Sequence, residues 1–401
     1  MNDTAIYLAC KDHAQFYREK SGDIIPNMLR TPIKEALQIA QRDLRTCYVS
    51  EGIIAGPHHF TDVWGRDGYF AALGAMTLGG QEDFAVVNRM IDQFFSFQLP
   101  SGMLPYRLMR SKMTLGKYRG KPTYLETPQP TYRLRGIGQN ILDGTTLTVL
   151  FSALMNRKEH LQKIISALEF LKTKEKNGLL WDGPMAEWND CVWKFGNLLY
   201  SNVIYWYMYD RLEHFSLGFN KKLSLEFGQK KQHIAEALRK RLWNGKYFAD
   251  WNDIKRHDYL YPYGNCLAVA WGLTNEEESH SILDSVGGAT AQFGIQTNTP
   301  KYPWWRVDFL HRAIGMGDYQ NQSVIWWQPV ISFLSALQKM GRKKEAEKLA
   351  QKISAKIVVD QQIHECYEPN GKNEPVKRLA YQSESPFAWA SGMIVHALSQ
   401  L

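Results

Sequence analysis

Two kinds of apolar pattern alternate along this chain, and they restrict the fold more than any other feature. Residues 323–337 and 386–398 are apolar almost all round the helices that they predict, which is typical of a helix covered on every side. Residues 342–358 instead carry one apolar and one charged face, as a helix at the surface does. We therefore expect fully covered helices inside a layer of amphipathic ones.

Helical periodicity runs through most of the chain, with little that resembles a strand. Polar and glycine-containing joints separate the segments. About a dozen helices in alternating order predict an all-α toroid of six inner and six outer helices, with one domain over residues 1–401. The predicted helices are a segment after Arg66 and residues 31–46, 82–98, 144–156, 158–173, 196–216, 224–243, 263–273, 276–285, 308–315, 323–340, 342–358 and 385–400.

Two stretches depart from this pattern. Residues 99–143 are rich in Pro, Gly, Arg and Tyr, and we expect a long excursion over one face, with room for a short hairpin. Loops of this length are usually functional. Residues 245–262 alternate aromatic and polar groups and predict a loop with a short strand. In a toroid, loops at one end form a concave pocket where a ligand would bind.

Composition and charge narrow the function. The chain has 13 Trp, 20 Tyr and 18 Phe; indole faces stack on sugar rings, although large helical cores also use tryptophan. The net charge is +8, with basic residues gathered in 107–122 and 340–348. This surplus fits either an anionic partner or a solvated surface; we favour the surface, because acids are interleaved and no nucleic-acid-binding motif is present.

The cellular setting follows from what the sequence lacks. No run approaches the roughly 20 apolar residues that a membrane span needs, and the first residues do not resemble a secretory signal. Five scattered cysteines without a CxxC pair fit a reducing compartment and argue against a zinc site. We expect a cytoplasmic protein, a monomer or homodimer, without metal or cofactor and without membrane or nucleic-acid partners.

Two clusters in the first half of the chain offer acids beside aromatic rings. In residues 61–70, Asp67 could accept from adjacent sugar hydroxyls while Arg66 donates or fixes Asp67. In residues 181–194, Asp190 and two further acids lie among three indoles. Such surroundings raise the pKa of a carboxyl, as a general acid requires. Helix caps, a local ion pair or a tryptophan-lined core would explain both clusters equally simply.

Two clusters lie in the second half. Residues 302–328 resemble an aromatic sugar-binding wall, and residues 363–371 place acids around a turn; an ordinary cap and a polar turn are the simpler alternatives. Glycoside hydrolysis needs two carboxyls that flank the bond to be cleaved. In a toroid, acids from distant clusters would meet across the central pocket.

The order of these motifs resembles the six-hairpin glycosidases, a group that includes glycogen-debranching amylo-α-1,6-glucosidases, processing α-glucosidases with mannosylglycerate hydrolases, and alkaline/neutral invertases. The resemblance runs from about residue 55 to the C-terminus. Its motifs are Trp64–Asp67, Asp143–Thr145, Glu187–Asp190 with Trp193, Tyr319–Trp326, Glu365–Tyr367 and Phe387–Gly392. Gln322 stands where the family often has glycine.

The resemblance implies an (α/α)6 barrel and net inversion at the anomeric carbon, without a metal. It places the general acid at Asp190 and the general base at Glu365. The substrate would be an α-linked glucoside-like or related small glycoside, and the excursion 99–143 would set its length. Substrate contacts are expected from Trp64, Arg66, Asp67, Asp143, Glu187, Trp188, Trp193, Tyr319, Gln322, Trp326 and Trp389.

Two other functions, and one feature of the hydrolase's substrate, stay open on the sequence alone. A sugar isomerase, epimerase or lyase on the same toroid would use pocket-facing histidines, for which His257, His311 and His364 are candidates. A non-catalytic carbohydrate-binding toroid would need no paired acids. Within the hydrolase interpretation, the basic stretch 107–122 could recognise a carboxylate or phosphate on the substrate.

Overall fold

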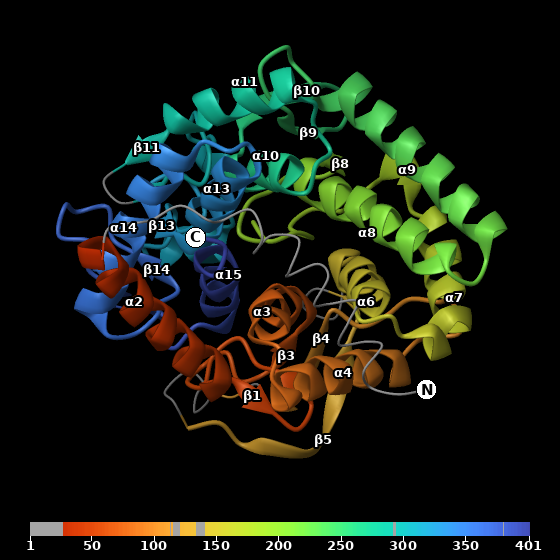
Figure 1. Cartoon of the computed structure of the whole chain (residues 1–401), viewed down its shortest axis with the longest axis horizontal. Helices are drawn as coiled ribbons and strands as arrows, with labels where there is room; N and C mark the ends of the chain where they lie inside the picture. The colour runs from red at the N-terminus through yellow and green to blue at the C-terminus, as the bar shows by residue number, and fades with distance from the viewer. Residues whose placement is uncertain (1–26, 113, 115–120, 134–140, 292–293, 380) are drawn as a thin grey trace.

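The computed structural model describes residues 27–112, 114, 121–133, 141–291, 294–379 and 381–401, and in this part of the chain the helices form two concentric rings (Figure 1). The inner ring consists of α3 (Gly65–Leu78), α6 (Asp143–Leu154), α8 (Leu199–Leu217), α10 (Pro262–Ala270), α13 (Trp327–Lys339) and α15 (Ala388–Leu398). The outer ring consists of α2 (Asn27–Thr46), α4 (Gln81–Ser96), α7 (Leu161–Lys172), α9 (Lys221–Leu242), α11 (Glu276–Gly287) and α14 (Lys343–Asp360). The predicted (α/α)6 barrel is confirmed.

Burial separates the two rings as the sequence predicts. Nearly every residue of α6, α10 and α15 is buried, because neighbouring helices cover these segments on all sides. In α9, by contrast, the buried apolar residues recur at helical spacing on one face and are Phe227, Ile234, Leu238 and Leu242. Residues 323–337 and 386–398 fall on α13 and α15, and residues 342–358 fall on the outer helix α14.

The ring closes where α15 packs against α3. A Cβ atom at Gly74 would lie 2.5 Å from the carbonyl oxygen of Gly392, and one at Gly392 would lie 2.3 Å from the carbonyl oxygen of Ala71. The two backbones are therefore in direct contact, which only residues without a Cβ permit.

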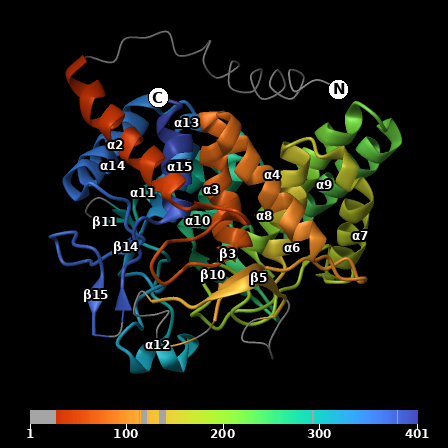
Figure 2. The same cartoon turned by 90° about the horizontal axis from the view of Figure 1, so that it is seen from below.

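The two ends of the ring carry different connections. Each inner helix joins the next outer helix through a short segment, such as residues 79–80 between α3 and α4 and residues 218–220 between α8 and α9. Each outer helix joins the next inner helix through a longer one, such as residues 288–326 between α11 and α13. Figure 2 shows β5, β15 and the short helix α12 (Phe309–Ala313) gathered at the end with the long connections.

The long connections contain small antiparallel sheets. The excursion 99–143 contains the hairpin β4-β5, in which β4 also pairs with β3 to give the order β3-β4-β5. The stretch 245–262 contains β9 and β10, and β9 also pairs with β8 to give the order β10-β9-β8. The described strands are β1 (Tyr48–Val49), β2 (Gly52–Ile53), β3 (Val63–Trp64), β4 (Arg107–Ser111), β5 (Tyr124–Thr131), β6 (Glu175–Lys176), β7 (Leu179–Leu180), β8 (Asn197–Leu198), β9 (Ala249–Asn252), β10 (Arg256–Leu260), β11 (Thr290–Ala291), β12 (Gly294–Ile295), β13 (Ile325–Trp326), β14 (Cys366–Tyr367), β15 (Lys377–Arg378) and β16 (Tyr381–Gln382).

Several inner helices begin later than the sequence predicts. The predicted helices 196–216 and 323–340 begin only at Leu199 and Trp327. The residues just before them are β8 and β13, which pair with β9 and β14 from other connections. Tertiary pairing thus overrides local helical periodicity at the N-terminal end of these helices. No helix in the described part of the chain combines the length and the apolar character needed to cross a bilayer.

The contact between α3 and α15 gives a stability test. We expect Gly392→Ala to lower the free energy of unfolding by about 1–3 kcal/mol, because the new methyl group meets the backbone of α3 and must push the helices apart. Thermal or urea denaturation measures this. Gly218→Ala is the control, since a Cβ at Gly218 meets nothing within 4 Å; an equal loss in both variants would contradict the close packing.

Candidate active site

The sequence motifs lie together at the N-terminal ends of the inner helices. Asp67 is in the first turn of α3 and Asp143 is the first residue of α6. Asp190, Tyr319 and Glu365 lie in the long connections that lead into α8, α13 and α15. The positive ends of the helix dipoles point toward this end of the ring and stabilise negative charge there.

Asp190 is held by the side chain of Gln320. The Gln320 amide nitrogen donates to Asp190 Oδ1 at 3.3 Å and to the Trp188 carbonyl at 2.8 Å, while its oxygen accepts from the Cys191 N–H at 3.0 Å. Burial raises the pKa of Asp190, and the positive charges of Arg66 and His311 oppose this rise. The carboxyl therefore retains a proton more readily than an exposed aspartate, as a general acid requires.

Glu365 is buried, with 3% of its surface exposed, and is held by two tyrosines. Tyr319 donates its hydroxyl hydrogen to Glu365 Oε1 at 2.7 Å, and Tyr381 donates to Oε2. The Glu384 N–H also donates to Oε2, at 3.3 Å. Burial raises the pKa of Glu365 to about 8, while the hydrogen bonds from both tyrosines act in the opposite direction by stabilising the carboxylate.

One dipeptide therefore links the two acids. Tyr319 holds Glu365 and the next residue, Gln320, holds Asp190. His311 lies beside this dipeptide. Its ring stacks on that of Tyr319 with the centroids 6.1 Å apart, and its positive charge lowers the pKa of Asp190. Acids 175 positions apart in the chain are thus held by adjacent residues of one connection.

A second group surrounds Arg66. Its Nε lies 2.5 Å from Asp143 Oδ2. Arg66 therefore fixes Asp143, whereas the sequence motif suggested that it could fix Asp67. Burial raises the pKa of Asp67 to about 7, with the charge of Arg66 opposing the rise. Asp190 affects the pKa values of both Arg66 and Asp67, which places this group beside the acid.

The stretch 107–122 contributes to the same region in part. The Arg107 guanidinium lies 4.5 Å from the centre of the Trp64 ring and 3.8 Å from Asp62. Arg110 instead pairs with Glu51 at 2.8 Å. Residues 113 and 115–120, which contribute further basic groups to this stretch, lie outside the described residues. Recognition of an acidic group on the substrate stays a prediction.

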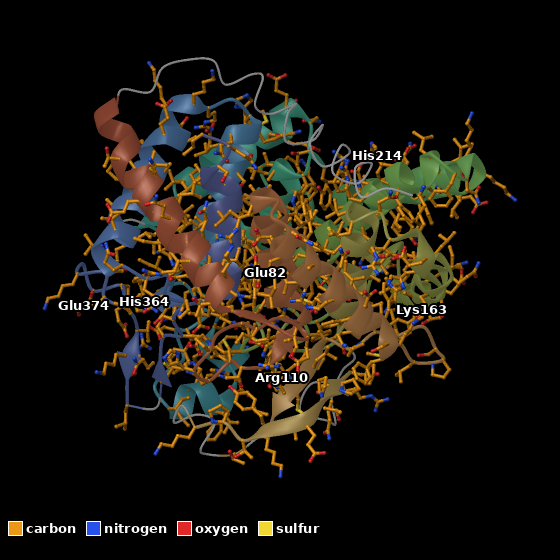
Figure 3. All side chains as sticks on the ribbon, turned by 60° about the horizontal axis from the view of Figure 1, so that its bottom comes forward. Glu82, Arg110, Lys163, His214, His364 and Glu374 are labelled. Atoms are coloured by element: carbon orange, nitrogen blue, oxygen red, sulfur yellow. The ribbon has the colours of Figure 1, made fainter. Side chains whose placement is uncertain are left out.

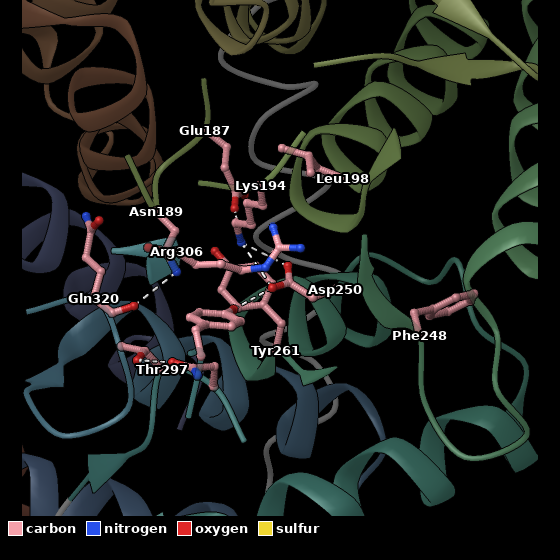
Figure 4. Close-up of polar contacts among 12 residues, drawn as sticks. Glu187, Asn189, Lys194, Leu198, Phe248, Asp250, Tyr261, Thr297, Arg306 and Gln320 are labelled. Carbon is pink, nitrogen blue, oxygen red and sulfur yellow. Dashed lines mark hydrogen bonds and ion pairs between the residues drawn. The ribbon is translucent and has the colours of Figure 1, made fainter. Parts of the chain in front are cut away.

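Glu187 lies in a fully buried charge network (Figure 4). Lys194 pairs with Glu187 and with both carboxylate oxygens of Asp250, at 2.9 and 3.2 Å. Tyr302 donates to the same Asp250 carboxylate. Burial raises the pKa of Glu187, and the Lys194 charge counteracts it. Glu187 therefore supports the acid-bearing loop, and its predicted contact with substrate stays a prediction.

Three predicted sugar contacts are buried aromatic rings. Trp188, Trp326 and Trp389 are each at most 3% exposed, and the Trp188 ring meets those of Trp326 and Trp389 edge to face at 5.4 and 6.3 Å. Trp326 also donates its indole N–H to the Tyr319 carbonyl at 2.6 Å. These rings fix the residues that hold Asp190 and Glu365, and their contact with substrate stays a prediction.

The remaining predicted residues differ in accessibility. Trp193 is 46% exposed, whereas Tyr319 is 8% exposed. Gln322 has φ of 76°, a left-handed conformation that favours glycine. This explains why a glycine is frequent at the equivalent position of the motif that the sequence resembles.

Sequence reasoning missed several residues that hold the site. Gln320 lies inside the motif Tyr319–Trp326, which the sequence indicated, but its contact with Asp190 could not be predicted. Lys194 and Asp250 gave no signal, because nothing in their spacing shows that they pair across 56 residues. Tyr381 lies in a short hairpin strand and Glu384 follows it, and only the tertiary structure brings them to Glu365.

Among the described residues, one group of side chains has metal-ligand geometry: Asp210, Glu213 and His214 on α8. Lys231 pairs with both carboxylates, and Arg211 pairs with Asp210. Figure 3 shows His214 well away from Arg110, which lies on β4 at the end with the long connections. This group already has counter-ions and lies apart from Asp190 and Glu365.

The comparisons with solved structures concern the fold. A glycosidase in complex with glucose superposes with a TM-score of 0.65 at 14% identity, over 94% of this chain and 99% of that one. The fold is that of the six-hairpin glycosidases. A mannosylglycerate hydrolase of family GH63 from Thermus thermophilus, in complex with Tris, gives a TM-score of 0.60 at 13% identity, over 91% and 99% of the two chains.

A rhamnosidase from Klebsiella oxytoca with bound rhamnose is also similar, with a TM-score of 0.58 at 13% identity over 94% of this chain and 64% of that one. A scan against protein-family models and a search of the curated proteins found no match. The six-hairpin architecture therefore links the chain to glycosidases through shape, and identities this low assign no substrate.

The buried charge network gives a pH-dependent stability test. Lys194→Met should lower the free energy of unfolding by about 3–5 kcal/mol near pH 8, because two buried carboxylates lose their counter-ion. The folded pKa of Glu187 is raised above its unfolded value, so the folded state loses stability as the pH rises through the folded pKa. Loss of the Lys194 charge raises the pKa of Glu187 further in the variant, so this carboxyl is neutral there near pH 5 and needs no counter-ion. The stability gap between variant and wild type should therefore narrow near pH 5.

Urea denaturation at pH 5 and pH 8 measures both effects. Lys230→Met is the matched control, since Lys230 pairs with Glu175 but both side chains are partly exposed, and its loss should be about 1 kcal/mol or less. A Lys194→Met deficit that stays constant between the two pH values would contradict the assigned network.

Proposed function

We propose that the protein is an inverting glycoside hydrolase for an α-linked glycoside, with Asp190 as general acid and Glu365 as general base. The observation that carries this proposal is the dipeptide Tyr319–Gln320, whose side chains hold one acid each. The shared fold with glycosidases supports it. A carbohydrate substrate follows from the same fold and from the aromatic rings around both acids.

In the proposed reaction, Asp190 donates a proton to the glycosidic oxygen as the bond to the anomeric carbon breaks. Glu365 accepts a proton from a water that attacks this carbon from the opposite face. The two carboxyls of an inverting enzyme stand roughly 6.5–9.5 Å apart, which leaves room for the water. Inversion converts an α-glycoside into a product of β configuration.

The neighbours of each carboxyl suit these roles. Burial raises the pKa of both carboxyls, and their hydrogen-bond donors distinguish them. Asp190 accepts from one neutral amide, that of Gln320. The base must be ionised, and the hydroxyl groups of Tyr319 and Tyr381 stabilise its carboxylate against the same effect of burial.

The group around Arg66 fits the subsite for the sugar that is cleaved off. Asp67 is partly exposed beside Asp190 and could accept hydrogen bonds from neighbouring hydroxyls. Arg66 holds Asp143 beside it, while Trp64 offers a ring for stacking. The related structures act on or contain different sugars, and we propose an α-glucoside or a close relative.

The two other candidate functions have weaker support. An isomerase would need its histidines together, but each one has a separate environment: His257 bonds Asp253, His311 bonds Asp308, and His364 lies against Tyr367. A non-catalytic binding protein would have no use for two buried carboxyls with raised pKa values.

We further propose that the enzyme works in the cytoplasm. Four of its cysteines, Cys47, Cys191, Cys266 and Cys366, are buried free thiols. Buried thiols without disulfides fit a reducing compartment.

Replacement of either acid tests the proposal. Asp190→Asn and Glu365→Gln should each reduce turnover by about 10²–10⁴-fold, because each removes one proton transfer. The substrates to screen are α-glucosides, mannosylglycerate, glucosylglycerate and sucrose, with the anomer of the first product identified by NMR.

Glu374→Gln is the matched control, since Glu374 lies in the same connection as Glu365 but is exposed. Near-normal turnover in Asp190→Asn on every accepted substrate would overturn the acid assignment. A first product of retained configuration would overturn the inverting mechanism.

The tyrosine contact makes a prediction about pH dependence. Tyr319→Phe removes a donor to Glu365, so the pKa of this carboxyl should rise further. Since the base must be ionised, the acidic limb of the profile of kcat/KM against pH should move to higher pH. Lower activity with an unmoved limb would show that Tyr319 acts only through packing.

A further inference from the structure

Three exposed tryptophans lie on two connections that meet next to the segment carrying the proposed acid. Trp193, Trp304 and Trp305 are 46%, 68% and 63% exposed. Exposed aromatic clusters are uncommon on soluble domains and mark binding surfaces. Trp193 lies in the connection before α8, and the other two lie in the 3₁₀ helix Trp304–Arg306, in the connection before α13.

The backbone joins these two connections. Val192 and Val307 form an antiparallel bridge. On one side of it the Trp193 N–H donates to the Arg306 carbonyl at 2.6 Å, and on the other the Asp308 N–H donates to the Cys191 carbonyl at 2.8 Å. The Arg306 side chain adds a bond to the Trp193 carbonyl at 2.7 Å. Trp305 precedes the residue that pairs with Trp193, so the backbone segments that carry the three exposed indoles are adjacent.

This surface adjoins the acid. Cys191, which takes part in the pairing, follows Asp190 directly, and its N–H is bonded by the Gln320 side chain that also holds Asp190. A general acid protonates the oxygen of the leaving group. Side chains exposed beside it therefore meet the leaving-group part of a substrate, whereas Arg66 and Asp67 lie on the side of the sugar that is cleaved off.

We propose that Trp193, Trp304 and Trp305 form an aromatic platform that binds further sugar rings on the leaving-group side, which makes an α-linked oligosaccharide the preferred substrate. This inference rests on the proposed glycosidase function. It extends that function by assigning the chemical class of the leaving group.

The ring geometry favours sugars as the ligand. The planes of Trp304 and Trp305 are 85° apart with centroids 6.4 Å from one another, so the two indoles present faces in different directions. Arg312 covers the Trp304 ring at 4.8 Å, and its remaining N–H groups, with those of Arg306, can donate to hydroxyls. Indole faces stack on the C–H faces of pyranose rings. A small acidic leaving group, such as glycerate, has no ring face that an indole could stack on.

The test measures kcat/KM for maltose, maltotriose, maltopentaose and mannosylglycerate, and the binding of each to the Asp190→Asn chain by calorimetry. We expect both quantities to improve with oligosaccharide length. Trp305→Ala should weaken maltopentaose binding roughly three- to tenfold, with a smaller effect on maltose, because one stacking contact is lost. Trp305→Tyr should restore most of it.

Phe219→Ala is the control, because Phe219 is 39% exposed but lies in the short joint between α8 and α9; it should bind all probes normally. Equal performance of maltose and maltopentaose, or preference for mannosylglycerate, would overturn the platform and leave the hydrolase intact. If the protein neither binds nor cleaves any of the screened glycosides, both the platform and the hydrolase proposal are overturned. Self-association that Trp305→Ala abolishes, without an effect on sugars, would assign the surface to a second copy and also overturn the platform.

Discussion

The six inner helices are covered on all sides, and the remainder of the structure follows from this enclosure. A covered helix has few positions for charged groups. Within α8, the charged groups Asp210 and Glu213 are paired with Lys231 of the outer helix α9. Close contact between α3 and α15 at Gly74 and Gly392 completes the ring. The polar groups of the candidate site accordingly lie in or beside the connections that enter the inner helices, and not along their lengths.

The two ends of the ring then take different roles. Short joints at one end leave little chain to build a site. Long connections at the other bring small sheets, aromatic rings and acids to the N-termini of the inner helices. The same enclosure that stabilises the ring removes water from these acids, so burial is the largest influence on the pKa values of Asp67, Asp190 and Glu365. Arginine, amide and tyrosine side chains then lower the pKa of each carboxyl to a different extent.

Much of the architecture could be predicted because the local periodicity of apolar residues indicates where each helix lies. Apolar residues all round 323–337 and on one face of 342–358 indicate the ring in which each helix lies. The motifs around Asp190 and Glu365 were also visible, since each is contiguous. The starts of α8 and α13 were placed too early, because strand pairing with distant connections competes there with helix formation.

What the sequence determined by itself is the order of inner and outer helices, because helical periodicity depends on neighbouring positions. Contiguous motifs also selected Asp190 and Glu365 as the candidate acids. Only the tertiary structure decided how the acids are held. Gln320 reaches Asp190 across 130 residues and Tyr319 reaches Glu365 across 46. The spacing of these residues in the sequence does not show that they are partners. Closure of the ring brings them together, and burial then requires their polar groups to bond to one another.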